Sequence, residues 1–230
     1  MSEKKGSLSI HSENIFPIIK KWLYSDHDIF YRELISNGCD AITKLKKLAL
    51  MGEYEEREDN GMGMTAEEVD EYINQIAFSG AQDFLNKYKD KANEDQIIGH
   101  FGLGFYSAFM VADKVTIDTQ SYQADAAPVH WESEGGTEFE MRDGDKEGIG
   151  TRITLYLNED SAEFSNEYRA REVIEKYCGF MPFPISLVNA DAEPQYETIE
   201  KDELTDKDTV VETVVEEEKT EEKEKEDGTK

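Results

Sequence analysis

Three polar side chains follow one line along a predicted helix. In the stretch RELISNGCDA, residues 32–41, Glu33, Asn37 and Asp40 are spaced four and three residues apart. On a helix at about 100° per residue they fall within an arc of roughly 60°, beside the apolar face. Asn37 and Gly38 are poor helix formers, and glycine inside a helix costs about 1 kcal/mol. Their place at the centre of this helix indicates a functional role, with an ordinary solvated face as the alternative.

A second candidate is the sequence DNGMGM, residues 59–64. An aspartate ahead of a G-x-G turn can accept a hydrogen bond from an exocyclic amine, and the glycines let a ring approach the backbone. Asp59 and the turn after it could therefore bind a base. The alternative is an ordinary turn, because Asn-Gly and Asp-Asn-Gly are common turn sequences.

Two more glycine clusters follow. Gly99, Gly102 and Gly104 in GHFGLGFYSAF precede a predicted buried helix. Free N–H groups at a helix N-terminus suit a phosphate, although glycines can also serve close packing. Further on, Gly150 and Thr151 begin a predicted strand. The sequence contains no P-loop pattern and no HRD or DFG kinase motif, so the commonest nucleotide-binding folds are excluded.

The elements that must position these residues are read from hydrophobic periodicity. We predict helices over residues 14–24, 28–50 (ending at Gly52), 65–76 (with a Thr65–Glu68 capping box), 81–90 and 105–112, and a loop over 91–104. A period of two then predicts strands around 115–117, 129–131, 139–141 and 153–157. A helix over 166–178 capped by Ser165 and an edge strand at PFPISLV complete the list. Helices followed by a meander of strands predict the α+β class, with helices on one face of a mostly antiparallel sheet.

Composition sets the wider bounds. The 230 residues carry a formal charge of -27, which argues against nucleic acid as the main partner. Residues 191–230 are acidic and hold almost no aromatics, so we expect a disordered linker after one domain spanning residues 1–190. The two distant cysteines predict neither a disulfide framework nor a zinc site, in keeping with a cytoplasmic protein. No signal peptide or membrane-spanning run is visible.

The order of these motifs, ExxxN on a helix, DxGxG, GxxGxG and then GT on a strand, resembles the ATP-binding fold shared by DNA gyrase B, histidine kinases, MutL and the ninety-kilodalton heat-shock chaperones. Four longer segments, ENIFPIIKKWLYS, IFYRELISNGCDA, IAFSGAQDFL and IGHFGLGFYSAFMVADKV, are similar to the N-terminal domain of a bacterial chaperone of that heat-shock family. The resemblance covers about residues 8–188 and implies a two-layer Bergerat-type fold.

The resemblance also implies roles. Glu33 matches the general base that activates water, and Asn37 matches the ligand of a Mg²⁺ ion that bridges the phosphates of ATP or ADP. The other matching positions line the nucleotide pocket, at Asp40, Asp59, Gly63, Met64, Gly99, Gly102, Gly104, Phe105 and Thr151. Residues 78–104 match the lid that closes over ATP.

Two departures from the family are visible. Members usually have a strand or two between the long helix and DxGxG, whereas here LMGEYEERE runs directly into DNGMGM. Either a true deletion or an absent segment explains this, and a deletion would remove the strand that delivers Asp59. Phe78 stands where many members have a lysine, so we assign no phosphate-binding lysine there.

The implied function is slow ATP hydrolysis in a chaperone that assists protein folding. Full-length members have client proteins and form homodimers, and we expect this chain alone to be largely monomeric, with no membrane partner. Two alternatives remain. One is a sensor histidine kinase or topoisomerase domain, which should carry a phospho-acceptor histidine helix or a basic DNA-facing patch. The other is a module that binds nucleotide or partner proteins without hydrolysis.

Overall fold

The computed structural model describes residues 26–55, 60–75, 103–136 and 138–192. The chain divides into two units, Met1–Val188 and Asn189–Lys230, and only residues 189–192 of the second are described. The predicted boundary at residue 190 stays a prediction. The predicted helices over 14–24 and 81–90 lie outside the described residues, as do Asp59, Gly99, Gly102 and nearly all of the predicted lid.

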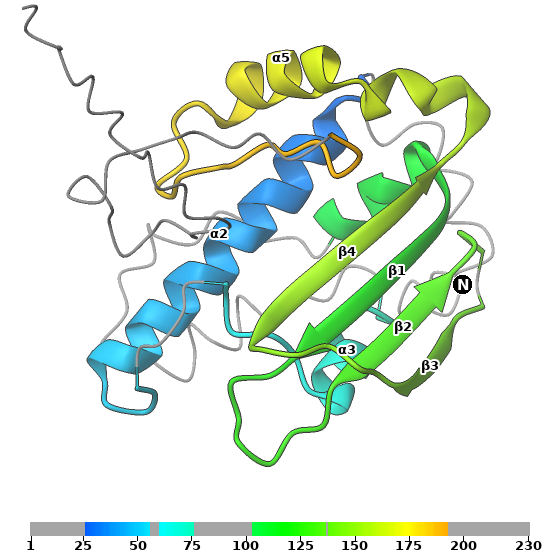
Figure 1. Cartoon of the computed structure of the whole chain (residues 1–230). Helices are drawn as coiled ribbons and strands as arrows, with labels where there is room; N and C mark the ends of the chain where they lie inside the picture. The colour runs from blue at the N-terminus through cyan, green and yellow to red at the C-terminus, as the bar shows by residue number, and fades with distance from the viewer. Residues whose placement is uncertain (1–25, 56–59, 76–102, 137, 193–230) are drawn as a thin grey trace, which may run out of the picture. The chain divides into compact units, whose positions relative to one another are not determined.

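The described elements form a sheet with helices against it. Four antiparallel strands run in the order β3-β2-β1-β4. In the view of Figure 1, α3 and η2 lie behind the sheet, α2 runs alongside β4, and no described helix crosses in front of the strands. This arrangement confirms the predicted α+β class. The bounds in chain order are α2 (Ile29–Leu50), α3 (Ala66–Tyr72), the 3₁₀ helix η2 (Gly104–Met110), β1 (Ala112–Gln120), β2 (Val129–Ser133), β3 (Glu140–Asp143), β4 (Gly150–Leu157), the 3₁₀ helix η3 (Glu159–Ser165) and α5 (Glu167–Cys178).

The core forms between the sheet and η2. Ile117 of the central strand β1 lies opposite Trp131 of β2 and Ile153 of β4. Phe105 packs edge to face on Trp131, with ring centroids 5.8 Å apart. All side chains from Phe105 to Met110 are buried, so η2 has no solvent face. The sheet and η2 therefore give α2 and the loop after it a rigid support.

Two helix ends agree with the sequence. The C-terminus of α2 is closed by Gly52, which has φ 76° and donates its N–H to Ala49 O at 3.0 Å. The predicted capping box is present at α3, where Glu68 N donates to Thr65 Oγ1 at 3.2 Å and Thr65 N donates to Glu68 Oε2 at 2.8 Å. These contacts are local along the chain, and local patterns predict them well.

Other predictions need correction. The segment predicted as a helix over 105–112 is the 3₁₀ helix η2, and its turns close by bonds such as Tyr106 N to Leu103 O at 3.1 Å. Ser165 does not cap α5, because it ends η3 and its hydroxyl donates to Ala162 O. The cap is Asn166, whose Oδ1 accepts from Tyr168 N and Arg169 N at 3.0 and 3.3 Å. The run PFPISLV, residues 182–188, forms no strand.

The two cysteines provide a test of the packing around α2 and α5. Cys39 and Cys178 are free thiols that are 4% and 3% exposed. Burial raises the pKa of both thiols, and the neighbouring Asp40 raises that of Cys39 further. At pH 8 we expect both thiols of the native protein to react with DTNB much more slowly than the same thiols in the urea-unfolded chain. Only the thiolate reacts, and the raised pKa makes the thiolate scarce in the native protein. Two rapid equivalents from native protein would contradict this packing.

The same shifts predict a pH dependence of stability. Each thiol has a higher pKa in the folded state than in the unfolded chain, so the folded state holds its proton more tightly. This contribution is complete below the ordinary thiol pKa of about 8.5 and is lost as the pH rises through the folded value. The urea concentration at the midpoint of unfolding should therefore decrease as the pH is raised above about 8.5. In a Cys39→Ser, Cys178→Ser double variant this decrease should be less steep.

Candidate nucleotide-binding site

The three residues of the polar line on α2 differ in exposure. Asp40 is buried at 6% exposure, Glu33 is half-buried, and Asn37 is exposed beside Gly38. Glu33 Oε1 accepts from Arg32 Nη2 at 2.6 Å and from Arg32 Nε at 3.2 Å. The line therefore passes from the interior to an open side of the helix, and the carboxylate of Glu33 is paired with a cation.

The start of η2 lies directly against this line. A β-carbon placed on Gly104 would be 2.7 Å from Glu33 Oε2 and 3.6 Å from Asn37 Nδ2. Gly104, Glu33 and Asn37, three of the predicted site residues, thus lie together, and the lack of a side chain at residue 104 permits the contact. The adjacent Phe105, which the resemblance places in the phosphate loop, has its ring in the core at 8% exposure.

The loop Asn60–Met64 lies against the next turn of α2 and the end of β1. A β-carbon on Gly61 would be 2.9 Å from Ala41 Cβ, and one on Gly63 would be 1.8 Å from Gln120 O. Gly63 also has φ 64°, a left-handed conformation that glycine adopts without strain. Both positions therefore require glycine because neighbouring atoms pack against the backbone there. An ordinary surface turn would require glycine only for its backbone conformation.

A buried threonine joins this loop to β4. Met64 N donates to Thr119 Oγ1 at 2.9 Å, and Thr119 Oγ1 lies 2.8 Å from Thr151 Oγ1. Thr119 is fully buried and was not predicted as a site residue. The signal was present in the sequence, since Thr119 continues the inward positions of Val115 and Ile117 and places a hydroxyl at a core position. Through Thr119, the predicted residues Met64 and Thr151 are held together.

The predicted site residues form two groups of contacts along α2. Glu33, Asn37 and Gly104 meet at one end, and Gly63, Met64 and Thr151 lie at the other. Between them, Ala41 of α2 lies against Gly61 of the loop. In chemical terms the first end offers a carboxylate, an amide and backbone N–H groups, and the second offers a hydroxyl and a glycine turn on which a flat ring can lie.

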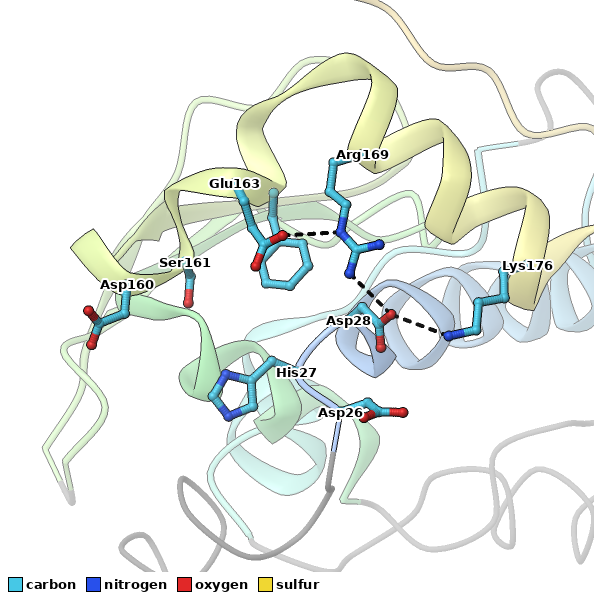
Figure 2. Close-up of a pocket in the computed structure, with 9 residues that line it drawn as sticks. Asp26, His27, Asp28, Asp160, Ser161, Glu163, Arg169 and Lys176 are labelled. Atoms are coloured by element: carbon cyan, nitrogen blue, oxygen red, sulfur yellow. Dashed lines mark ion pairs between the residues drawn. The ribbon is translucent and has the colours of Figure 1, made fainter.

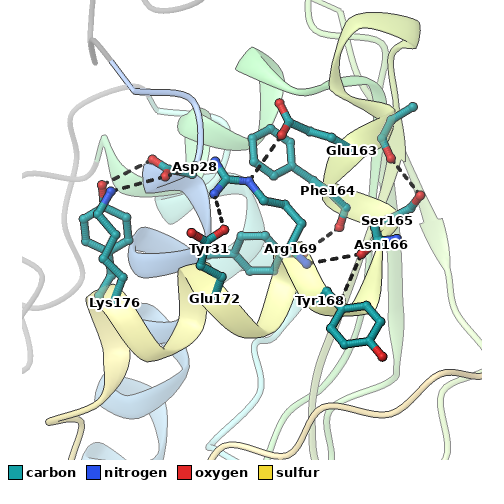
Figure 3. A network of polar contacts seen from close by, with 12 residues as sticks. Asp28, Tyr31, Glu163, Phe164, Ser165, Asn166, Tyr168, Arg169, Glu172 and Lys176 are labelled. Carbon is teal, nitrogen blue, oxygen red and sulfur yellow. Dashed lines mark hydrogen bonds and ion pairs between the residues drawn. The ribbon is translucent and has the colours of Figure 1, made fainter.

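The N-terminal end of α2 carries a different polar cluster that the sequence did not predict. Figure 2 shows a pocket lined by the residues just before α2, by η3 and by α5, with Asp28 between Arg169 and Lys176. Asp28 Oδ2 lies 3.5 Å from Arg169 Nη2 and 3.6 Å from Lys176 Nζ, and Oδ1 accepts from the Tyr177 hydroxyl at 3.3 Å. Figure 3 shows this network together with the Asn166 cap. Because Asp28 and Arg169 already engage each other, we interpret the cluster as an anchor that orients α2 on α5.

Comparison with known proteins agrees with the fold. A family model described as "Histidine kinase-, DNA gyrase B-, and HSP90-like ATPase" matches residues 31–135, which include most of α2, the loop Asn60–Met64, η2 and β1. The α+β fold and this match define an ATPase domain of that class.

More similar relatives narrow the class. The "Chaperone protein HtpG" of Bacteroides thetaiotaomicron is 52% identical over 200 residues, which cover 80% of this chain and 29% of that protein. The HtpG proteins of Porphyromonas gingivalis and Pasteurella multocida are 45% and 43% identical, covering 79% and 72% of this chain and 29% and 30% of their own length. The chain belongs to the bacterial HtpG (Hsp90) chaperone family and matches its N-terminal ATPase region.

Two further facts bear on the sequence predictions. The chain spans less than a third of the length of these relatives. The alignment with the Bacteroides protein is 200 residues long, but it covers only 80% of the 230 residues of this chain, which is about 184. That relative therefore has residues without a counterpart here. In the described residues, no helix is both long and apolar enough to cross a membrane.

Proposed function

We propose that this chain binds ATP with Mg²⁺ and hydrolyses it slowly. The single observation that supports this most strongly is the contact of Gly104 with Glu33 and Asn37. In this contact the glycine at the start of η2 lies against the carboxylate of Glu33 and the amide of Asn37 on α2. Glycine backbone beside a carboxylate and an amide is the chemistry that a phosphate, its metal ion and an attacking water require.

The base would bind at the opposite end. Asp59 immediately precedes the loop Asn60–Met64 and would accept a hydrogen bond from the exocyclic amine of adenine. Gly63 and Met64 would frame the ring, and the exposed Thr151 would support it through water. The Thr119 hydroxyl bonds both Met64 and Thr151, so this end of the site is held rigidly before nucleotide arrives.

The phosphates would lie along α2 toward Gly104. The backbone of Gly99, Gly102 and Gly104 would donate hydrogen bonds, and Asp40 would line the wall. The residues present fit Mg²⁺, because that ion is usually held by one or two protein oxygens together with substrate phosphates. The exposed amide of Asn37 offers such an oxygen, and among the described residues no group of three His, Cys, Asp or Glu forms a separate metal site. When bound, the ion would neutralise charge on the phosphates.

Glu33 would act as the general base. Its Oε1 is occupied by Arg32, while Oε2 faces Gly104, where the terminal phosphate would end. Oε2 would take the proton of the attacking water, and Arg32 would hold the carboxylate in place. A positioned general base contributes about 10²–10⁴-fold to a rate.

The wider role follows from the family and is likewise a proposal. We propose that the full-length protein is a cytoplasmic, homodimeric chaperone that binds unfolded or partly folded proteins. The present chain alone would be largely monomeric.

Nucleotide binding is tested by a thermal shift with Mg-ADP. At a ligand concentration of roughly 100 times Kd, a ligand that binds only the native state adds about 2.7 kcal/mol to the free energy of unfolding. Asp59→Asn should abolish the shift, whereas the control Asp143→Asn, on the exposed strand β3, should keep it. No shift of the parental chain at millimolar nucleotide would reject the proposal.

A module that binds nucleotide without hydrolysis is the second candidate. The ion pair of Arg32 with Glu33 favours it, because the carboxylate is already engaged. A single-turnover assay with labelled ATP separates the two functions. Phosphate release above the rate in buffer supports hydrolysis, and binding without any release supports the second candidate.

A further inference from the structure

We propose that the ring of Tyr54 positions the loop Asn60–Met64 and so sets the affinity of the site for the base of the nucleotide. This inference rests on the proposed function. It concerns the short connection between α2 and DNGMGM, in which the strand that usually leads into this motif is not apparent from the sequence.

The connection leaves α2 in a defined direction. Glu53 N donates to Leu48 O at 3.0 Å, and Gly52 N donates to Ala49 O at the same distance. These two bonds close the end of α2 in the manner of a Schellman motif. Tyr54 follows directly after this closed end of the helix.

The ring of Tyr54 reaches the turn after β1. It meets the ring of Tyr122 edge to face, with centroids 6.1 Å apart and planes at 88°. Such edge-to-face pairs stabilise a contact by more than the area that they bury. The contact therefore ties the beginning of the connection to the same turn against which the loop packs.

Tyr122 in turn holds the loop. Its backbone N–H donates to Met62 O at 2.8 Å, and Gly63 lies against the backbone O of Gln120, two residues earlier. A path of direct contacts thus runs from the end of α2 through Tyr54 and Tyr122 to Met62 and Gly63. The ring pair can hold the loop where a preceding strand would otherwise do so.

The hydroxyl of Tyr54 does not contribute to holding the loop. The atom is buried and, within the described part of the chain, has no hydrogen-bond partner. A buried hydroxyl without a partner opposes folding. The ring is therefore the part of the side chain that the loop needs, and phenylalanine should replace tyrosine without loss.

The test compares Tyr54→Ala, Tyr54→Phe and the control Tyr168→Ala, whose tyrosine on α5 is 85% exposed. Calorimetric titration with Mg-ADP should give a Kd raised about tenfold for Tyr54→Ala. The Phe variant and the control should stay within about twofold of the parental chain. Where turnover is measurable, KM for ATP should rise in Tyr54→Ala while kcat stays unchanged, since Glu33 lies at the other end of the site.

The outcomes separate the two proposals. Absence of ADP binding by the parental chain would reject the proposed function itself. If the parental chain binds ADP, unchanged affinity of Tyr54→Ala would overturn the role of Tyr54 alone. An equal loss in Tyr54→Phe would also overturn it, because the hydroxyl would then be the active group. If Tyr54→Ala does not fold by circular dichroism, Tyr54→Leu takes its place with the same expected loss.

Discussion

Replacing Glu33 with glutamine is expected to leave Mg-ADP binding intact and to lower ATP turnover by about 10²–10⁴-fold. Glutamine keeps the shape of the side chain beside Gly104 but has no basic oxygen at neutral pH. A β-carbon built on Gly104 would lie only 2.7 Å from Glu33 Oε2, so the two residues pack closely. A substitution that changed the shape of the Glu33 side chain would alter this packing as well as remove the base. Single-turnover release of phosphate and titration with ADP measure the two effects separately.

The matched control is Glu67→Gln in the first turn of α3, where the side chain is exposed. It removes one negative charge as Glu33→Gln does, but far from the polar line. Both variants should give the ADP affinity of the parental chain, and only Glu33→Gln should lose turnover. Hydrolysis by Glu33→Gln at the parental rate would show that another group takes the proton.

Gly63→Ala is expected to abolish the ADP shift and to lower the free energy of unfolding by roughly 2–4 kcal/mol. A β-carbon there would lie 1.8 Å from Gln120 O, which is backbone and cannot rotate away. The left-handed φ of 64° adds its own cost. The loop would have to leave β1, and Met64 would lose its bond to Thr119. Urea unfolding measures the stability, and a thermal shift with Mg-ADP measures the binding.

Gly52→Ala separates the two causes. Gly52 has a similar φ of 76°, but among the described residues no atom other than those of its chain neighbours lies within 4 Å of its β-carbon position. It should cost only the backbone strain, about 1–2 kcal/mol, and should keep the ADP shift. A loss of stability in Gly63→Ala no larger than in Gly52→Ala would mean that the contact with Gln120 is not as close as described.

Predictions that depended on neighbours in the sequence did well. The extent of α2, its end at Gly52 and the Thr65–Glu68 capping box are confirmed. Each depends on bonds within one helical turn, so the residues involved are visible together in the sequence. The α+β class followed from periodicity for the same reason.

Predictions that depended on competition between elements did less well. Ser165 has the side chain of a typical N-cap, but in the structure it is the last residue of η3. Asn166 is therefore the cap, and α5 begins at Glu167. The apolar run at 182–188 had the composition of a strand, but a strand needs a partner edge, and this segment pairs with none of the described strands.

The sequence by itself determined which chemical groups this protein has and their order. It showed a line of acid and amide on a helix and three glycine clusters, and these were enough to resemble a family that the relatives then confirmed. Only the tertiary structure decided which of these groups touch. The pairing of Arg32 with Glu33, the seat of Gly104, the Thr119 link and the Tyr54–Tyr122 contact all depend on packing. Most join residues far apart in the chain, and packing of that kind is set by the whole core and leaves no pattern in a short stretch of sequence.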